Sequence, residues 1–441
     1  MTTISIFIIL FLGLSLLRVP IAYSIMVAAL AGFLMNNIRL AMIPPALLSG
    51  LDNFPLLAIP AFIFAGQLMT GGGISHSIID FINSAMGRFR GNLGSVLVVS
   101  SMLFGSISGS SLATVTAIGG IMTPEMRNKG YSDRYIAALL SASGFLGILI
   151  PPSVPGVIYA LTTGQGVTAV WMSTLLPGMV LGIAYVIINY LVIGRKQGKP
   201  TEPLKLKPFV AGIQRTIPKA SVAVLMPVII FGGVYGGVFT PTEAGVVAVF
   251  YGFLAGWIIY PLVFKMKTDM KITSNIRIAT INCAAICLLI AGATLVGRLV
   301  ALVGASTLLA NFLMGVTESK VLFLIITNLF FLLMGMFLET NTSILIFAPL
   351  LSPIAVEYGV HPIHFGAIML LNLEIGLITP PFAANLFVAC RMTSTTINKI
   401  MKPMMPFYIV CVIVLLIVTF LPGLALWAPS FFESTGTGTI P

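Results

Sequence analysis

Two kinds of polar interruption divide the apolar stretches of this sequence, and their oxygen atoms suit a cation such as Na⁺. Residues 106–111 and 335–343 are polar tips inside long apolar stretches, and residues 147–152 and 376–381 each read Gly-x-x-x-Pro-Pro. Hydroxyls and unwound carbonyls can coordinate a cation without a large buried charge, and proline leaves carbonyls unpaired because it lacks an N–H group. We expect cation ligands from Ser106, Ser108, Ser110, Gly144, Gly147, Ile150, Gly335, Glu339, Thr340, Gly376 and Thr379.

Further polar residues beside these tips and breaks could hold an anionic ligand. The N-terminus of a helix that starts at a break carries partial positive charge, which favours a carboxylate. We expect this anion site to include Ser111, Pro151, Ser153, Asn341, Thr342, Asn372, Pro380 and Asn385. The alternative is that Gly and Ser only allow close helix packing, but this explains poorly why both tips pair with a Pro-Pro break.

Three charged residues fall inside apolar segments, where charges are rare and usually functional. Glu339 belongs to the second tip and is the best charged candidate for cation binding, directly or through water. Glu374 lies just before the second break and either binds a cation or pairs with a basic residue. Arg298 lies within a predicted span and either extends to the interface or faces a hairpin.

The interruptions belong to two repeat units. Residues 131–152 resemble residues 360–381, with Gly147 and Gly376 spaced by 229 residues, and Gly73 matches Gly304 at a spacing of 231. Three predicted spans separate the units, and an odd number places them in opposite orientations. We therefore expect an inverted-topology repeat, whose first hairpin enters from the cytoplasm and whose second enters from the opposite side. Paired interruptions in two such halves are the best sequence indicator of a transporter's binding site.

The composition predicts a polytopic membrane protein. Hydrophobic residues make up 58% of the 441 residues and charged residues only 8%, against about 25% charged residues in soluble domains. The net charge of +11 does not indicate a nucleic-acid partner, because 11 of the 23 Lys and Arg residues lie in two short connections, 195–219 and 265–277. Basic connections of this kind typically face the cytoplasm.

The predicted fold class is an all-α polytopic membrane protein with two re-entrant hairpins and two broken helices. We expect spans at residues 4–17, 21–35, 54–69, 168–193, 222–239, 244–264, 276–303 and 407–427, hairpins at 94–122 and 321–351, and broken spans at 134–162 and 363–390. Residues 74–86 predict an amphipathic helix. The resulting domains are N-terminal scaffold spans (1–53), a first repeat (54–162), scaffold spans with basic loops (163–275), a second repeat (276–391) and a C-terminal span with a tail (392–441).

Motifs for enzymatic chemistry are missing from the sequence. There is no Walker loop and no Cys/His spacing typical of a metal site, and the four cysteines all lie in apolar stretches. We therefore expect neither an enzyme nor an ATP-driven pump. The N-terminus has no basic region before its first apolar run, which indicates an uncleaved span.

Several stretches resemble the large membrane subunit of the tripartite ATP-independent periplasmic (TRAP) transporters: residues 57–66, 105–111, 147–153, 239–245 and 375–381. The similarity extends over essentially the whole chain. It implies an elevator-type transporter in the bacterial inner membrane, in which hairpins and broken helices move against a scaffold. It also implies Na⁺ as coupling ion, a separate small four-helix membrane subunit and a periplasmic substrate-binding protein. Two positions depart from the family pattern: Glu339 stands where Asp is frequent, and residues 382–384 replace a Val-Gly pair.

The resemblance implies import of a small organic anion: a C4-dicarboxylate, sialic acid or another sugar acid. One alternative is a self-sufficient Na⁺/dicarboxylate symporter of similar fold that needs no binding protein. Another is a membrane scaffold or intramembrane enzyme without transport, in which substitutions at the tips and breaks would have no effect.

Overall fold

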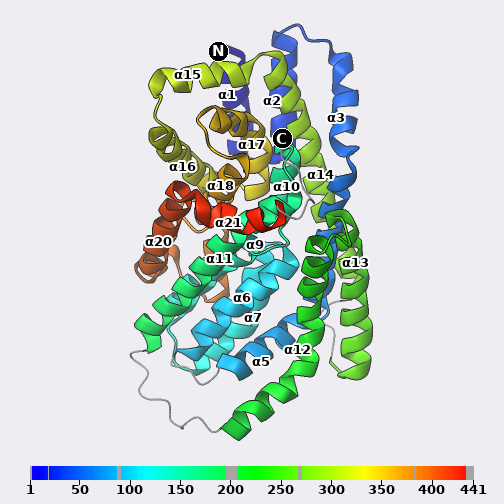
Figure 1. Ribbon diagram of the computed structural model, residues 1–441, viewed down its shortest axis with the longest axis vertical. Coiled ribbons are helices and arrows are strands. Elements are labelled where there is room, and N and C mark those ends of the chain that lie inside the picture. The colour runs from blue at the N-terminus through cyan, green and yellow to red at the C-terminus, as the bar shows by residue number, and fades with distance from the viewer. Residues whose placement is uncertain are drawn as a thin grey trace.

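The structure is a computed structural model that describes residues 2–17, 19–86, 91–194, 206–266, 271–381 and 383–433. Every regular element in this part of the chain is helical. Eight of the described helices are long and apolar enough to cross a membrane, or up to nine if a bent pair counts as one span. The all-α polytopic prediction is therefore confirmed, and Figure 1 shows the helices gathered in one elongated bundle.

The first repeat unit consists of an arm helix, an amphipathic helix, a helical hairpin and a broken helix. These elements are α4 (Ala58–Gly71), α5 (Ile74–Met86), α6 (Asn92–Ser108), α7 (Ser111–Asn128), α8 (Asp133–Gly144), α9 (Leu146–Leu149) and α10 (Val154–Thr163). Helix α5 has the predicted bounds, and it buries Ile74, Ile78 and Ile82. The chain bends by 46° between α8–α9 and α10, where Pro151 and Pro152 prevent a regular helix.

The second repeat unit has the same order of elements. They are α14 (Ile272–Leu302), α15 (Ala305–Val316), α16 (Lys320–Phe337), α17 (Thr340–Glu357), α18 (Pro362–Gly376) and α19 (Ala384–Met392). Equivalent glycines adopt the same left-handed backbone in both units: φ is 75° at Gly73 and 62° at Gly304, and 79° at Gly130 and 70° at Gly359. Such angles are easy only for glycine, so the repeat seen in the sequence is also a repeat of backbone conformation.

The remaining helices surround the two units. They are α1 (Thr2–Leu16), α2 (Ile21–Met35), α3 (Ile43–Leu51), α11 (Val167–Asn189) with its extension η3 (Tyr190–Gly194), α12 (Leu206–Tyr235), α13 (Pro241–Phe253) with its extension η4 (Leu254–Val263), α20 (Ile397–Phe420) and α21 (Pro422–Glu433). Three candidate spans, α11, α12 and α13, separate the described parts of the two units, as the inverted-repeat prediction requires.

Helix α2 has the predicted bounds, and α1 begins two residues and ends one residue before its predicted bounds. Each helix has only 15 residues, about 22 Å, which is shorter than a bilayer core of about 30 Å, so neither is a candidate span by length. Other predicted bounds are wrong. Helix α3 was not expected. The predicted last span, 407–427, is instead α20, which begins at Ile397 and ends at Phe420, because Pro422 starts a new helix after the non-helical Leu421.

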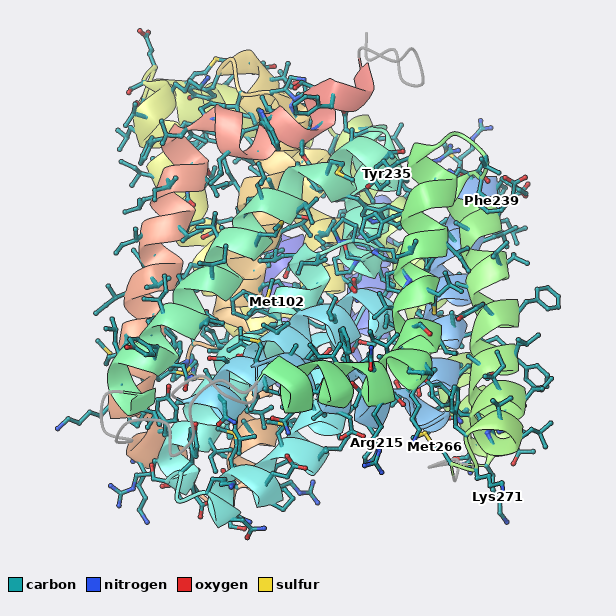
Figure 2. The ribbon with its side chains drawn as sticks, turned by 60° about the horizontal axis from the view of Figure 1, so that its bottom comes forward. Met102, Arg215, Tyr235, Phe239, Met266 and Lys271 are labelled. Atoms are coloured by element: carbon teal, nitrogen blue, oxygen red, sulfur yellow. The ribbon has the colours of Figure 1, made fainter. Side chains whose placement is uncertain are left out.

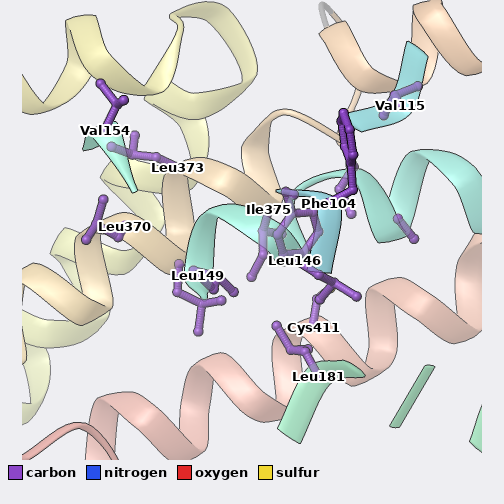
Figure 3. Close-up of a cluster of buried hydrophobic side chains, with 14 of the residues drawn as sticks. Phe104, Val115, Leu146, Leu149, Val154, Leu181, Leu370, Leu373, Ile375 and Cys411 are labelled. Atoms are coloured by element: carbon purple, nitrogen blue, oxygen red, sulfur yellow. The ribbon is translucent and has the colours of Figure 1, made fainter. Parts of the chain in front are cut away.

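The most deeply buried core surrounds the hairpins and breaks. Figure 3 shows Phe104 of α6, Leu146 of α9 and Ile375 of α18 close together, with Leu181 of α11 and Cys411 of α20 on one side. All five residues are buried. Helices from both units therefore share one core, and α11 and α20 enclose it.

The two basic connections start and end at the same end of the molecule. Figure 2 shows Arg215 and Lys271 toward the lower edge of the molecule, and Tyr235 and Phe239 at the opposite ends of α12 and α13. Residues 195–205 and 267–270, which carry several of the predicted basic side chains, lie outside the described residues. The described ends agree with the prediction that both connections lie on one face.

Candidate functional site

A cavity of about 670 Å³ lies where the tips of both hairpins meet both breaks. Helices α4 and α14 complete its wall. We call it the central cavity. It is lined by seven of the residues predicted to bind ions or anions: Ser108, Ser110, Ser111, Gly335, Glu339, Thr340 and Asn341. The structure thus brings residues from positions more than 200 apart in the sequence into one site.

Glycines let each hairpin tip touch its break, backbone against backbone. A Cβ atom added to Gly147 would lie 2.1 Å from the Cα of Gly105, and one added to Gly376 would lie 2.5 Å from the Cα of Gly335. Real Cβ atoms do not approach that closely, so these positions need glycine. Gly147 and Gly376 therefore bring the tip and break oxygens together, in equivalent ways in the two units.

The first tip is held by a small network of hydroxyls. Gly109 turns the chain with a φ of 61°. The Ser108 and Thr114 hydroxyls lie 3.2 Å apart, and Thr114 donates to the Ser110 carbonyl at 2.8 Å. The Ser106 hydroxyl instead donates to the Leu103 carbonyl of its own helix at 2.8 Å. Ser108 and Ser110 line the central cavity, whereas Ser106 does not.

One hydrogen bond joins the first tip to the second break. The Ser111 hydroxyl donates to the side-chain oxygen of Asn385 at 3.1 Å, and both residues are buried. The amide nitrogen of Asn385 has no hydrogen-bond partner among the described residues. It lies 3.5 Å from where a Cβ on Gly144 would be. This buried donor is available for an acceptor such as a carboxylate oxygen.

Two carboxyl groups lie where the second tip meets its break, Glu339 on the tip and Glu374 in α18. The Thr340 hydroxyl donates to one Glu374 oxygen at 2.9 Å, and the other Glu374 oxygen is buried without a partner among the described residues. The Asn341 amide donates to Glu339 at 2.6 Å, and Glu339 is exposed and lines the cavity. Both carboxyl groups face the central cavity, whose described lining residues include no basic side chain.

Other predicted site residues do not line the cavity. They are Ser106, Gly144, Gly147, Ile150, Pro151, Ser153, Thr342, Asn372, Gly376, Thr379, Pro380 and Asn385. Ser153 accepts from the Gly156 N–H at 3.3 Å and so caps α10. Asn372 is buried and donates to Asn328 of α16 at 2.7 Å. The Thr379 hydroxyl donates to a carbonyl of its own turn. These residues shape the breaks and the packing around them.

Sequence reasoning missed several polar residues of the site. Gln67 and Thr70 of α4 and Asn282 of α14 line the central cavity. Tyr408 of α20 donates to the Ile378 carbonyl at 2.5 Å, so one carbonyl of the second break is already satisfied. A lone amide in an apolar span was the available signal for Gln67 and Asn282.

Comparisons with known proteins agree on one family. Residues 8–424 match the family model described as "Tripartite ATP-independent periplasmic transporter, DctM component". The chain is 35% identical to the C4-dicarboxylate TRAP transporter large permease protein DctM of Pseudomonas aeruginosa, over 86% of this chain and 87% of that protein. It is 32% identical to the sialic acid TRAP transporter large permease protein SiaM of Vibrio cholerae, over 96% and 98%.

A solved structure supports the fold. The YdaH transporter of Alcanivorax borkumensis aligns with a TM-score of 0.57 over 90% of this chain and 89% of that one, at 16% sequence identity. At that identity the likeness concerns the fold alone. The match to the family model and the two permeases covers nearly the whole sequence, and the chain therefore belongs to the DctM family, the large membrane subunits of the TRAP transporters.

Proposed function

We propose that this chain is the substrate-translocating subunit of a Na⁺-coupled secondary importer of small organic anions, working by an elevator mechanism. The observation that carries the proposal is the central cavity, in which two hairpin tips and two helix breaks converge on hydroxyls and carboxyls, and in which Ser111 of the lining bonds to Asn385 of the second break. A C4-dicarboxylate, sialic acid or another sugar acid is the expected substrate, since relatives are named for the first two.

The charge of the central cavity supports cation coupling. Glu339 and Glu374 line it, and its described lining includes no basic side chain. An organic anion would meet two carboxyl groups there, and like charges at close range repel. Bound Na⁺ ions would offset this repulsion. A bound cation would therefore favour binding of the anion at this site, and the bound anion would favour the cation by the same factor.

The contacts between tips and breaks support an elevator mechanism. Gly105 packs on Gly147, Gly335 packs on Gly376, and Ser111 bonds to Asn385 across the two units. A displacement of the hairpins with the broken helices would therefore carry the tip and break residues of the site along together. The predicted domain boundaries and the site assignments remain part of this proposal.

Partners and location follow from the family. We propose a separate small four-helix membrane subunit, a periplasmic binding protein that delivers the anion, and a place in the bacterial inner membrane with the basic connections on the cytoplasmic side. The relatives are transporter permeases, and we propose no enzymatic reaction for this chain.

Reconstitution tests the proposal. The chain and its candidate small subunit would be placed in liposomes, and uptake of labelled succinate and N-acetylneuraminic acid would be measured under a Na⁺ gradient, with and without the binding protein. We expect uptake of one of them only with both Na⁺ and the binding protein. Uptake of free substrate without the binding protein would instead identify a self-sufficient symporter.

A further inference from the structure

Arg298 lies in a second cavity that shares no lining residue with the central one. This upper cavity has a volume of about 560 Å³ and is bounded by α3 and α14 on one side and by α10 and α17 on the other. Figure 1 shows these four helices in the upper half of the molecule, whereas α5, α6 and α7 lie in the lower half. Arg298 is exposed and is the only charged side chain among the described lining residues.

The repeat places Arg298 at a position equivalent to one in the central cavity. Arg298 follows Gln67 by 231 residues, the spacing that also relates Gly73 to Gly304. Ile63 and Gln67 of α4 line the central cavity, and the equivalent residues of α14, Thr294 and Arg298, line the upper cavity. The same face of the arm helix therefore lines a cavity in each unit.

The polar groups of the upper cavity favour an anion. The hydroxyls of Ser49, Thr162 and Thr294 donate to carbonyls of their own helices at 2.8–3.0 Å, so they offer no free proton. The Arg298 guanidinium makes no ion pair with any residue in the described part of the chain. Its planar fork of N–H groups matches the two oxygens of a carboxylate.

We propose that the upper cavity is an entrance site for a carboxylate anion, which Arg298 attracts and holds before the anion reaches the central cavity. The site lies between the arm-side helices α3 and α14 and the helices α10 and α17 of the hairpin and broken-helix body, at the end opposite to the first hairpin. The identity of the anion rests on the proposed function, but the charge selectivity of the cavity does not.

Chemical labelling tests the charge selectivity without transport. The exposed Ser49 would be replaced by cysteine in a chain whose four native cysteines are changed to serine. Its reaction with an anionic methanethiosulfonate, the sulfonatoethyl reagent, would be compared with that of the cationic trimethylammonium-ethyl reagent. We expect the Arg298 charge to raise the anionic-to-cationic rate ratio about fivefold. Arg298→Gln, which copies Gln67, should remove this preference, and Arg298→Lys should keep it.

Matched controls keep the result interpretable. Val238 is exposed and does not line the upper cavity. The anionic-to-cationic labelling ratio of Val238→Cys should therefore not change when Arg298→Gln is introduced. Thr162→Cys is a second reporter if Ser49→Cys does not fold. A rate ratio that stays the same at both reporters when Arg298→Gln is introduced would overturn the proposal.

A protection arm distinguishes a solute anion from a lipid phosphate, which the same guanidinium would bind. Millimolar succinate or N-acetylneuraminate should slow labelling in liposomes of pure phosphatidylcholine. If these acids do not slow labelling but phosphatidylglycerol in the liposomes does, the site binds lipid headgroups and is not an entrance site. Because labelling needs no Na⁺ gradient and no binding protein, failed uptake with intact protection would contradict the proposed function and leave this inference standing.

Discussion

Replacing Gly376 by alanine tests how closely the second hairpin tip must approach its break. The added Cβ would lie 2.4 Å from the carbonyl carbon and 2.5 Å from the Cα of Gly335. Non-bonded carbon atoms prefer about 3.5–4.0 Å, so the two backbones must separate by about 1 Å. The Gly335 atoms that this Cβ would meet are main-chain atoms in a buried region. No flexible side chain can therefore move aside to make room.

We expect Gly376→Ala to destabilise the protein by about 3 kcal/mol, the upper range for overpacking a core. Because the separation occurs beside Glu374 and Thr340, it should also weaken Na⁺ binding and reduce Na⁺-dependent uptake at least tenfold. The assay is thermal unfolding in detergent with and without Na⁺, followed by uptake in liposomes.

Two comparisons decide the outcome. Gly147→Ala should behave alike, since its Cβ would lie 2.1 Å from the Cα of Gly105. Gly315→Ala of α15, where a Cβ meets nothing within 4 Å, should leave both stability and uptake near the wild-type values. If Gly376→Ala unfolds and transports as Gly315→Ala does, the close backbone contact is not part of the site.

Three further predictions concern side chains at the two tips and the second break. Ser108→Ala and Glu339→Ala should each abolish Na⁺-dependent uptake while the protein stays folded, and normal uptake in both would refute the cation-site assignment. Glu374→Gln keeps an acceptor for Thr340 but removes the charge, so the Na⁺ concentration for half-maximal uptake should rise at least tenfold; an unchanged Na⁺ dependence would exclude Glu374 from cation binding. Asn385→Ala removes a buried donor and should raise the substrate concentration for half-maximal uptake about tenfold or more, with little change in Na⁺ dependence.

The elements that carry the site could be predicted because their signals are local. Pro151 and Pro152 interrupt a helix whatever surrounds them, and the apolar spacing in residues 74–86 defines α5 without reference to other helices. A repeat at constant spacing then relates one half to the other. Predicted helix bounds were wrong where the sequence signal for a helix end was weak. At Leu421, a single following proline ends one helix and starts the next.

Only some of the polar side chains that line the cavity could be predicted, because the face that a helix turns to the cavity depends on neighbours distant in the sequence. Asn372 and Gln67 are both lone amides in apolar spans, yet Asn372 is buried against Asn328 while Gln67 lines the cavity. Likewise, the partner of the Ser111 hydroxyl is Asn385, 274 residues away. Sequence spacing gives the candidates, and helix packing decides among them.

The hydrogen bonds at the two tips make the duplicated halves unequal. Thr340 of the second tip bonds to Glu374 of its own unit, whereas Ser111 of the first tip bonds to Asn385 of the other unit. Gene duplication would have produced two identical sites, each free to change alone. With this asymmetry, a substitution of Ser111 removes a partner of Asn385 in the second half, so we expect these two positions to change together, although they lie in different halves.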